Sequence, residues 1–329
     1  MAELQPVIRP FETGDEVAIN NGFNQAFGLQ RPLAEWAWKF PPDPDGRLIM
    51  VAEVDGDIIA HYAAVAVRFA VDGAIWRAGQ IVDVFSTRAA RHLFARRGLW
   101  VHTVEAFFDH FGRSGRCPLM FGFPSQRALR LGVLQLGYDE MPLQEIDYLS
   151  RPSSGSTAGP RRLLYRAELA RDWEPRLDAL WRRAGPSYPV AAVRDAEWAL
   201  RRFAGHPGVR YHRFLITPRL TRDPVAFVVF RSDGGRCRWV DLVWDHSHPG
   251  ALDLVLHLSN RLAVQTGCEF EELWLNGDPE GRARLETAGF SRGPEPGKLV
   301  FGGRAFDPGL DLGSFDGRVY LTMADADLV

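Results

Sequence analysis

The alternation of apolar and polar positions in the first half of the chain predicts an edge strand, two helices and a run of antiparallel strands. The expected strands occupy residues 7–11, 48–54, 58–70 and 74–85, and the expected helices occupy residues 13–27 and 32–40. Asp55-Gly56 and Asp72-Gly73 join the last three strands, and this dipeptide is typical of tight hairpins. The pattern therefore predicts an antiparallel meander.

The stretch from Gln80 to Phe111 combines an apolar strand, a basic loop and an amphipathic helix. One helix face carries apolar residues at 3.6-residue spacing, namely Trp100, Val104, Phe107, Phe108 and Phe111. The loop before it is rich in arginine, with Arg88, Arg91, Arg96 and Arg97, and Gly98 stands where the helix should begin. Unpaired N–H groups and the helix dipole attract anions to such a position. We expect a site for a phosphate-bearing ligand here, the alternative being a solvated basic loop.

After this helix, a strand at residues 118–123, a helix at 125–136 and a strand near 145–149 complete the first half. Residues 151–160, RPSSGSTAGP, have the composition of a linker. The same order of elements then returns, and residues 128–138 match 282–290 in helix register and in a Gly-aromatic ending. We therefore expect an α/β (α+β) fold with two similar domains, residues 1–150 and 161–329. Each would be a mixed, mainly antiparallel sheet flanked by helices.

The two copies differ in the loop before their long helix. In the second copy this loop is Asp245-His246-Ser247-His248-Pro249-Gly250, which has no arginine and suits a pyrophosphate poorly. His246 and His248 have no third ligand at a usual spacing, so no metal site is expected. The second copy is therefore interpreted as a support for the first, and as a possible wall of its substrate site.

Composition excludes several classes of protein. With 329 residues, 46% hydrophobic residues and a net charge of −2, the chain is typical of a soluble globular protein and not of a general nucleic-acid or membrane-surface binder. Its three cysteines are odd in number and form no CxxC pair, which favours a reducing cytoplasm. The N-terminus has no targeting pattern, and no apolar run approaches the ~20 residues of a membrane span.

Several motifs together resemble the GNAT superfamily of acyl-CoA-dependent N-acyltransferases. They are residues 36–40 (WAWKF), 60–62 (AHY), Asp83, 96–100 (RRGLW), 121–125 (FGFPS), 194–198 (RDAEW) and 320–327 (YLTMADAD). More narrowly, the chain is similar to tandem-GNAT proteins associated with bacterial polysaccharide or cell-surface biosynthesis. The family's pyrophosphate loop is Arg/Gln-x-x-Gly-x-Gly/Ala. Arg96, Arg97 and Gly98 fit its middle, whereas Ala95 and Trp100 depart from its ends.

This resemblance implies acetyl-CoA or another acyl-CoA as co-substrate and a small-molecule amine as acceptor. The cofactor-binding residues that it implies are Val84, Phe85, Arg91, Arg96, Arg97, Gly98, Leu99, Trp100 and Ser125. A backbone N–H near Val84 or Phe85 would stabilise the oxyanion. The acceptor, an amino sugar or its nucleotide-linked form, would stack on Trp36 and Trp38, unless these tryptophans belong to the core.

The candidate acid–base residues are Asp83, His61 and Tyr62. Asp83 lies in an apolar strand, where burial would raise the pKa of its carboxyl and suit it to act as a general base. It would otherwise anchor neighbouring loop amides or face solvent. His61 and Tyr62 point to opposite faces of their strand, so at most one of them faces the acceptor directly. The tyrosine that often serves as acid in this family is replaced by Val133, which leaves water or Ser125 to protonate the thiolate.

Two other functions stay open at this point. A catalytically silent protein could bind acyl-CoA as a regulatory ligand. An aminoacyl transferase of the peptidoglycan-bridge type would instead take its acyl group from charged tRNA, and would need an extended basic surface. We expect an N-acyltransferase that binds no nucleic acid and is a monomer or homodimer.

Overall fold

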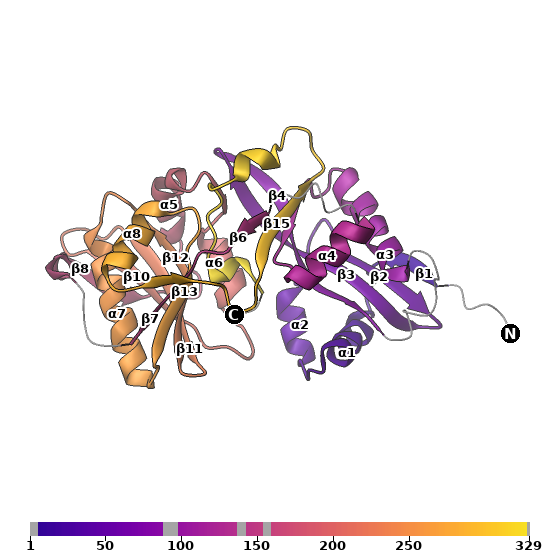
Figure 1. Ribbon diagram of the computed structural model, residues 1–329, viewed down its shortest axis with the longest axis horizontal. Coiled ribbons are helices and arrows are strands. Elements are labelled where there is room, and N and C mark those ends of the chain that lie inside the picture. Colours follow the sequence, from indigo (N-terminus) through magenta and orange to yellow (C-terminus); the bar gives the residue numbers. More distant parts are fainter. Residues whose placement is uncertain (1–5, 88–97, 137–142, 154–158, 328–329) are drawn as a thin grey trace. The chain divides into compact units, whose positions relative to one another are not determined.

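The computed structural model describes residues 6–87, 98–136, 143–153 and 159–327 (Figure 1). The contacts between residues divide the chain into two compact units. The first unit consists of Met1–Arg68, Trp76–Gln144 and Leu299–Ser314, and the second of Phe69–Ile75, Glu145–Lys298 and Phe315–Val329. Each contains a mainly antiparallel sheet flanked by helices, which confirms the predicted fold class.

The sheet of the first unit has the strand order β1-β2-β3-β4-β5-β15-β6. Its strands are β1 (Val7–Pro10), β2 (Leu48–Val54), β3 (Asp57–Val71), β4 (Ala74–Ser86), β5 (Leu119–Gly122), β6 (Leu143–Glu145) and β15 (Val300–Ala305). Its helices are α1 (Glu16–Phe27), α2 (Leu33–Lys39), α3 (Leu99–Phe107), which continues into a π-helical turn Phe108–Arg113, and α4 (Gln126–Leu136). The tip of the β3–β4 hairpin, residues 69–75, belongs by its contacts to the second unit.

Helices cover both faces of this first sheet because its inner strands are apolar on both sides. Residues of α3 pack on one face, in a cluster that includes Leu48, Met50, Tyr62, Val104 and Phe107. Residues of α1 and α2 pack on the other, in a cluster that includes Ile19, Trp36, Ile49, Val51 and Ala63. The alternation along β2 and β3 thus supplies two separate cores, one for each helix layer.

The sheet of the second unit has the order β14-β7-β13-β12-β11-β10-β8. Its strands are β7 (Tyr148–Pro152), β8 (Tyr165–Leu169), β10 (His212–Pro218), β11 (Ala226–Asp233), β12 (Arg236–Trp244), β13 (Phe270–Trp274) and β14 (Ser291–Gly293), while β9 (Val190–Ala192) pairs with residues 69–71. Its α-helices are α5 (Arg176–Ala184), α6 (Ala196–Phe203), α7 (Gly250–Thr266) and α8 (Pro279–Thr287). Short 3-10 turns lie at Pro160–Leu164, Gly185–Ser187, Leu312–Phe315 and Met323–Asp325.

The two units repeat one topology, as the sequence predicted. In the first, α3 connects the parallel strands β4 and β5, and α4 follows. In the second, α7 connects the parallel strands β12 and β13, and α8 follows. The two segments with a shared helix register, residues 128–138 and 282–290, therefore overlap helices at the same place in each repeat.

One strand of each sheet comes from the other half of the sequence. In the first sheet, β15 lies between β5 and β6, although it follows the last strand of the second repeat. In the second sheet, β7 lies between β13 and β14, although it follows the last strand of the first repeat. The exchange is reciprocal, so neither sheet is made from one continuous half of the chain.

This exchange differs from the predicted boundaries at 1–150, 151–160 and 161–329. The expected single strand near 145–149 is two strands, β6 and β7, which belong to different sheets. Arg151, expected in a linker, is buried in β7, where it donates to Glu271 (Nε–Oε1 3.0 Å) and lies over Phe290. Residues 154–158 of the expected linker lie outside the described residues. Near the C-terminus, Val319 and Leu321 form isolated β-bridges, with Val190 and Asn276 respectively.

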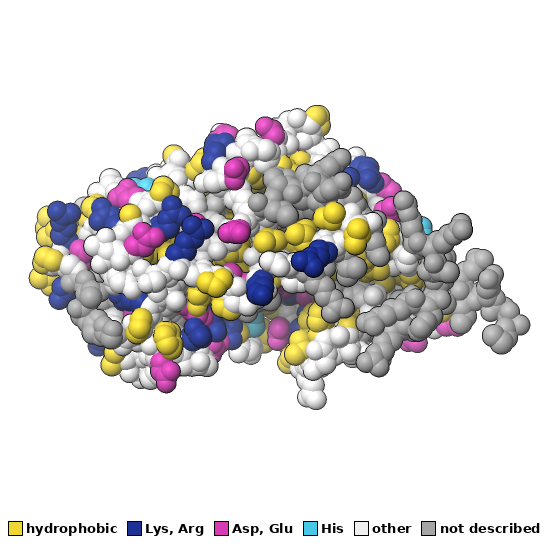
Figure 2. Space-filling view, viewed as in Figure 1, with side chains coloured by type: hydrophobic (Ala, Val, Ile, Leu, Met, Phe, Trp, Pro, Cys, Tyr) yellow, Lys and Arg dark blue, Asp and Glu magenta, His cyan; other side chains and the backbone are white. Residues whose placement is uncertain are grey.

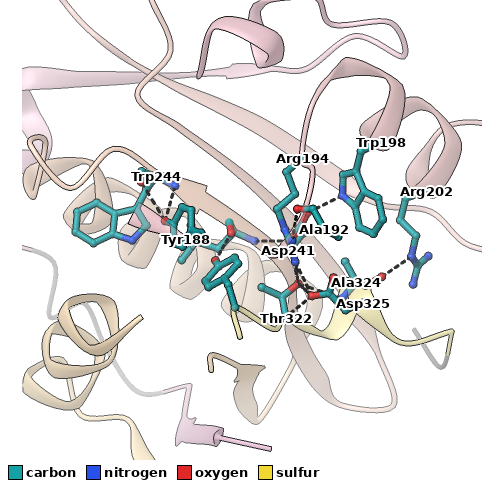
Figure 3. A network of polar contacts seen from close by, with 12 residues as sticks. Tyr188, Ala192, Arg194, Trp198, Arg202, Asp241, Trp244, Thr322, Ala324 and Asp325 are labelled. Carbon is teal, nitrogen blue, oxygen red and sulfur yellow. Dashed lines mark hydrogen bonds and ion pairs between the residues drawn. The ribbon is translucent and has the colours of Figure 1, made fainter. Parts of the chain in front are cut away.

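A buried polar network joins α6, β12 and the C-terminal segment in the second unit (Figure 3). Arg194 donates from Nε to Asp241 (3.0 Å), from Nη1 to the Ala192 carbonyl (2.9 Å) and from Nη2 to Asp325 (2.5 Å). Trp198 Nε1 donates to the other oxygen of Asp241 (3.1 Å). The side chains of Arg194 and Asp241 are fully buried, so each depends on the other for its charge balance.

We expect Arg194→Leu to lower the free energy of unfolding by about 3–5 kcal/mol, since it leaves two buried carboxylates without their cation. Urea unfolding of the full chain measures the change. Arg201 lies on α6, the helix that follows Arg194, but is 40% exposed in its side chain. Arg201→Ala should therefore stay within about 0.5 kcal/mol of the unmodified protein. Equal losses in the two variants would contradict this account of the network.

The strand exchange predicts that residues 1–150 do not fold alone. That fragment lacks β15, so β5 and β6 would lose the strand between them and expose two unpaired edges. Co-expression with residues 151–329 should restore a soluble complex. Circular dichroism and size-exclusion chromatography distinguish the cases, and a monomeric fragment 1–150 that unfolds cooperatively would refute the prediction.

Candidate active site

Strand β4 contains a bulge at Asp83. The φ angle of Asp83 is 51°, in the left-handed region that residues other than glycine rarely adopt. Val82 packs with the α1 and α2 layer, and Asp83 also contacts that layer, whereas Ile81 and Val84 pack with the α3 layer. Successive residues of a regular strand face opposite ways, so two neighbours on one side indicate an extra residue. The bulge turns the Asp83 carboxylate toward α1 and α2.

The bulge lies just beyond the parallel pairing of β4 with β5. The last pair in this register is Gln80 with Phe121, three residues before Asp83. Beyond it, β5 continues to pair with β15 through Gly122. The segment Asp83–Ser86 therefore follows the end of the parallel pairing. It contains Val84 and Phe85, near which the family resemblance implies the oxyanion donor.

Asp83 is the centre of a buried ion-pair cluster. Its carboxylate, 2% exposed, binds Nη1 of Arg31 and Nζ of Lys39, the latter at 2.5 Å. Burial by itself favours the neutral carboxyl, but Lys39 and Arg31 outweigh that effect and hold the pKa of Asp83 below its usual value. The prediction of a raised pKa was wrong, because no local pattern in the sequence indicates that two cations contact this carboxylate. Asp83 stays ionised and anchors the bulge.

His61 holds the backbone of the same bulge. Its Nδ1 lies 2.7 Å from the Asp83 carbonyl, which can only accept, so Nδ1 carries the hydrogen. The imidazole stacks on Phe85 at 5.1 Å between centroids and meets the Phe40 ring edge-on. Complete burial lowers the pKa of His61 to about 4, so the ring is neutral near neutral pH. A group of such low pKa is a weak general base, and we interpret His61 as a positioning residue.

The remaining candidates divide between core and surface. Tyr62 lies on the opposite face from His61, as expected, and packs on Phe107 and Phe108 in the α3 layer. Trp36 is 1% exposed and packs on Phe40, so it is a core residue and cannot stack on a sugar ring. Trp38, by contrast, is only partly buried.

The expected phosphate loop is described only at its end. Arg91, Arg96 and Arg97 lie outside the described residues, while Gly98 immediately precedes α3, as predicted. The Leu99 side chain is buried in an apolar cluster with Ala52, Ile59 and Ala60, and Trp100 packs partly against the α3 core. Ser125 Oγ accepts from the Ala128 N–H (3.3 Å) and caps α4. Any contact of Leu99 with a phosphate would therefore come from its backbone N–H.

Sequence reasoning missed Arg31 and Lys39. Arg31 lies between α1 and α2, and its backbone is fixed by Asn20 and Asn24, whose side chains bind its carbonyl and N–H at 2.7–3.1 Å. Arg31 precedes α2, the helix that carries Trp36 and Trp38, and Lys39 is its last residue. No local pattern in the sequence connects these two cations with Asp83 on β4, which lies more than forty residues further along the chain.

The two histidines near residue 246 have neighbours that suit structural roles. His246 lies against Trp244, with 4.3 Å between ring centroids, and His248 Nδ1 lies 3.3 Å from the Tyr165 hydroxyl. Within the described ranges, no group of three or more His, Cys, Asp or Glu side chains is arranged to hold a metal ion. In the same ranges, none of the helices combines the length and the apolar character needed to cross a bilayer.

Comparison with known proteins identifies the first unit. Residues 7–131 match the family model of an acetyltransferase (GNAT) domain. No curated protein matches the chain significantly in sequence. Among solved structures, the chain is similar to a GCN5-related N-acetyltransferase from Anabaena variabilis, with TM-score 0.69 and 10% identity, covering 92% of this chain and 73% of that one.

Two further structures share the fold. A GCN5-related N-acetyltransferase from Kribbella flavida has TM-score 0.64 and 15% identity, over 92% of this chain and 71% of that one. The glucosamine N-acetyltransferase region of a fungal multi-domain GH3 β-N-acetylglucosaminidase has TM-score 0.59 and 12% identity, over 92% and 38%. The chain therefore carries an acetyltransferase (GNAT) domain over residues 7–131, and it shares the fold of GCN5-related N-acetyltransferases over 92% of its length.

Proposed function

We propose that this protein transfers an acetyl or longer acyl group from acyl-CoA to a primary amine, and that the amine is an amino sugar or a nucleotide-linked amino sugar. The observation that supports acyl transfer most directly is the bulge at Asp83. It lies beyond the end of the parallel pairing of β4 with β5 and inside the matched acetyltransferase domain. The sugar is supported by the resemblance to polysaccharide-related tandem proteins and by the fold shared with a glucosamine N-acetyltransferase region.

The reaction requires a neutral amine, a donor for the developing oxyanion and a proton for the thiolate. We assign the oxyanion donor to a backbone N–H at Val84 or Phe85, which follow the bulge directly. The Asp83 carboxylate, held by its cations, and His61, bound to the Asp83 carbonyl, fix the backbone at this point. Their contribution is to keep the donor in place before the substrate arrives.

We propose that solvent, and not a protein side chain, accepts the amine proton and protonates the thiolate. Asp83 is ion-paired and has a lowered pKa, and His61 titrates near pH 4, so neither suits a base at neutral pH. Val133 on α4 has no proton to give to the thiolate. The amine therefore loses its proton to water or binds in its neutral form.

We assign binding of the CoA pyrophosphate to Arg91, Arg96, Arg97, Gly98 and the backbone N–H groups that begin α3. We assign contact with the acceptor sugar to Trp38. On the face that Figure 2 shows, basic and acidic side chains of the second unit are interspersed, so this face does not favour a tRNA donor. Cys117, Cys237 and Cys268 are buried and free of disulfides, which supports a reducing, cytoplasmic setting. For the assembly we propose a monomer or homodimer.

Release of free thiol from acetyl-CoA and longer acyl-CoAs tests the proposal. An amino sugar or nucleotide-linked amino sugar should stimulate thiol release, and calorimetry should detect acyl-CoA binding by the same preparation. Binding without stimulated release by any amine in the panel would instead favour a regulatory acyl-CoA-binding protein.

Arg96→Ala with Arg97→Ala should weaken CoA binding at least about tenfold, since each charge-assisted contact contributes roughly 1.5–3 kcal/mol. Calorimetric titration of CoA measures the loss. The paired replacement Arg182→Ala with Arg183→Ala, on α5 of the second unit, provides a control with the same change in charge. An unchanged affinity in the first variant, with its fold intact, would remove these arginines from the site.

Asp83→Asn should cost about 3 kcal/mol or more in unfolding free energy near neutral pH, because it leaves two buried cations without a counter-charge. The folded-state pKa of Asp83 lies below its unfolded value, so the wild-type advantage is present above about pH 4 and fades as pH falls through the folded pKa. Urea unfolding across this range measures the difference between the two proteins.

The same variant tests the role of Asp83 in chemistry. If solvent takes the amine proton, the apparent pKa of the acid limb of kcat/KM should be the same in Asp83→Asn as in the unmodified enzyme. Disappearance of that limb, together with a fall in kcat of about 10²–10⁴, would make Asp83 the general base after all.

A further inference from the structure

Strand β8 forms one edge of the second sheet. Its five residues, Tyr165–Leu169, pair with β10 in a regular antiparallel register, and the strand order of the described residues ends there. Figure 1 shows β8 at the outer margin of the second unit. Its sequence contains neither proline nor glycine, residues that often keep an edge strand from pairing further. The free side of β8 is therefore a surface on which another strand can pair.

The pairing with β10 shows which backbone groups of β8 point to this free side. The Ala170 N–H donates to the Arg213 carbonyl (3.0 Å), and the Arg219 N–H donates to the Leu164 carbonyl (2.9 Å). Every second residue of an antiparallel strand bonds to the same neighbour, so the even-numbered residues between 164 and 170 direct their backbone groups toward β10. The groups that point to the free side belong to Tyr165, Ala167 and Leu169.

The side chains of β8 alternate between core and surface. Tyr165 and Ala167 pack with the core cluster of the second unit. Arg166 and Glu168 therefore face the other way, and they form a partly exposed ion pair with each other, with 2.9 Å from Nε to Oε1. Glu168 also accepts from Nη1 of Arg176 (3.0 Å). One charge of each sign thus lies on either side of Ala167, on one face of an edge strand.

This order of charges is complementary to itself. When a second copy pairs antiparallel about a twofold axis at Ala167, Arg166 of each copy lies directly opposite Glu168 of the other. The same register pairs Ala167 with Ala167 and Tyr165 with Leu169, the residues whose backbone groups point to the free side. A shift by two residues would instead oppose two arginines or two glutamates, and a shift by one would mismatch the backbone groups. Charge and backbone thus select the same register.

Exposed apolar side chains lie at both ends of the strand. The N–H and Nε of Arg219 bind the carbonyls of Leu164 and Leu163, which places the next residue, Leu220, beside the start of β8. Figure 2 shows hydrophobic side chains at the left margin, where Figure 1 has β8. The twofold axis would bring the start of each strand beside the end of the other and cover these side chains. Those more than half exposed are Leu163, Leu164, Leu169, Trp173 and Leu220.

We propose that two copies of this chain form a twofold-symmetric dimer through antiparallel pairing of their β8 strands. The pairing joins the two second-unit sheets into one continuous sheet, and Arg166 and Glu168 form an ion pair across the axis in both directions. This inference does not rest on the proposed acyl transfer, and its test uses no acyl-CoA. It selects the dimer from the two assemblies that the proposed function leaves open.

Charge exchange between copies of the full-length protein tests the register. At micromolar concentration the unmodified protein should sediment at twice the 36.9 kDa of one chain. Arg166→Glu opposes carboxylates across the axis and Glu168→Arg opposes guanidinium groups, so each should weaken dimerisation at least about tenfold. An equimolar mixture of the two variants should restore the dimer, because carboxylates of one then face guanidinium groups of the other. Native mass spectrometry distinguishes this heterodimer from the homodimers.

Arg201→Glu on α6 is the matched control. Arg201 is 40% exposed in its side chain, as is Arg166, and the change of charge is the same. This variant should remain dimeric. Ala167→Pro removes an N–H from the axis without a bond to β10 being lost, and it should also give a monomer. Circular dichroism checks the fold of each variant.

Three results would overturn the proposal. The first is an unmodified protein that stays monomeric at about 0.1 mM. The second is a dimer that folded Arg166→Glu and Glu168→Arg both leave intact, since that dimer would use another surface. The third is a pair of monomeric charge variants that form no heterodimer when mixed. If either charge variant fails to fold, Ala167→Pro carries the test, and a dimer that persists in it would equally exclude β8 as the interface.

Discussion

A buried carboxylate at a strand bulge is the constraint on which this structure depends. Asp83 can remain ionised in the core only because Arg31 and Lys39 reach it, and they reach it only because the bulge turns it toward their helices. The strained backbone at Asp83 is in turn held by His61 through the carbonyl. Each of these features would be unfavourable alone, and together they fix the strand segment that precedes the expected thioester site.

The second unit shows the same solution with a different outcome. Its arginine is saturated by Asp241 and by Asp325, and the C-terminal segment that carries Asp325 is fastened further by the Tyr320 hydroxyl, which binds the Leu242 carbonyl. The chain thus supplies from its own C-terminal segment the second carboxylate that binds this arginine. A repeat that has filled its own polar site is suited to a structural role, which fits the absence of arginine from its loop at residues 245–250.

The reciprocal exchange of β7 and β15 explains why the repeat boundary is hard to see in the sequence. Each strand is short, with five residues in β7 and six in β15, so its length alone does not assign it to either sheet. Arg151 decides the placement of β7, since its guanidinium has a buried partner, Glu271, on the neighbouring strand β13. A composition rich in serine, glycine and proline after residue 152 then looks like a linker, although the strand before it is part of a core.

The sequence by itself determined most of the elements, the repeat and the resemblance to GNAT proteins, because each of these depends on periodicity, turn residues and short motifs that are local in the chain. Local patterns also predicted that a helix begins after Gly98 and that His61 and Tyr62 point to opposite faces of their strand. The tertiary structure decided the charge state of Asp83, the burial of Trp36 and the exchange of strands between sheets. These depend on partners such as Arg31, 52 positions from Asp83. Such long-range contacts leave no local pattern, and they set the electrostatics of the candidate site.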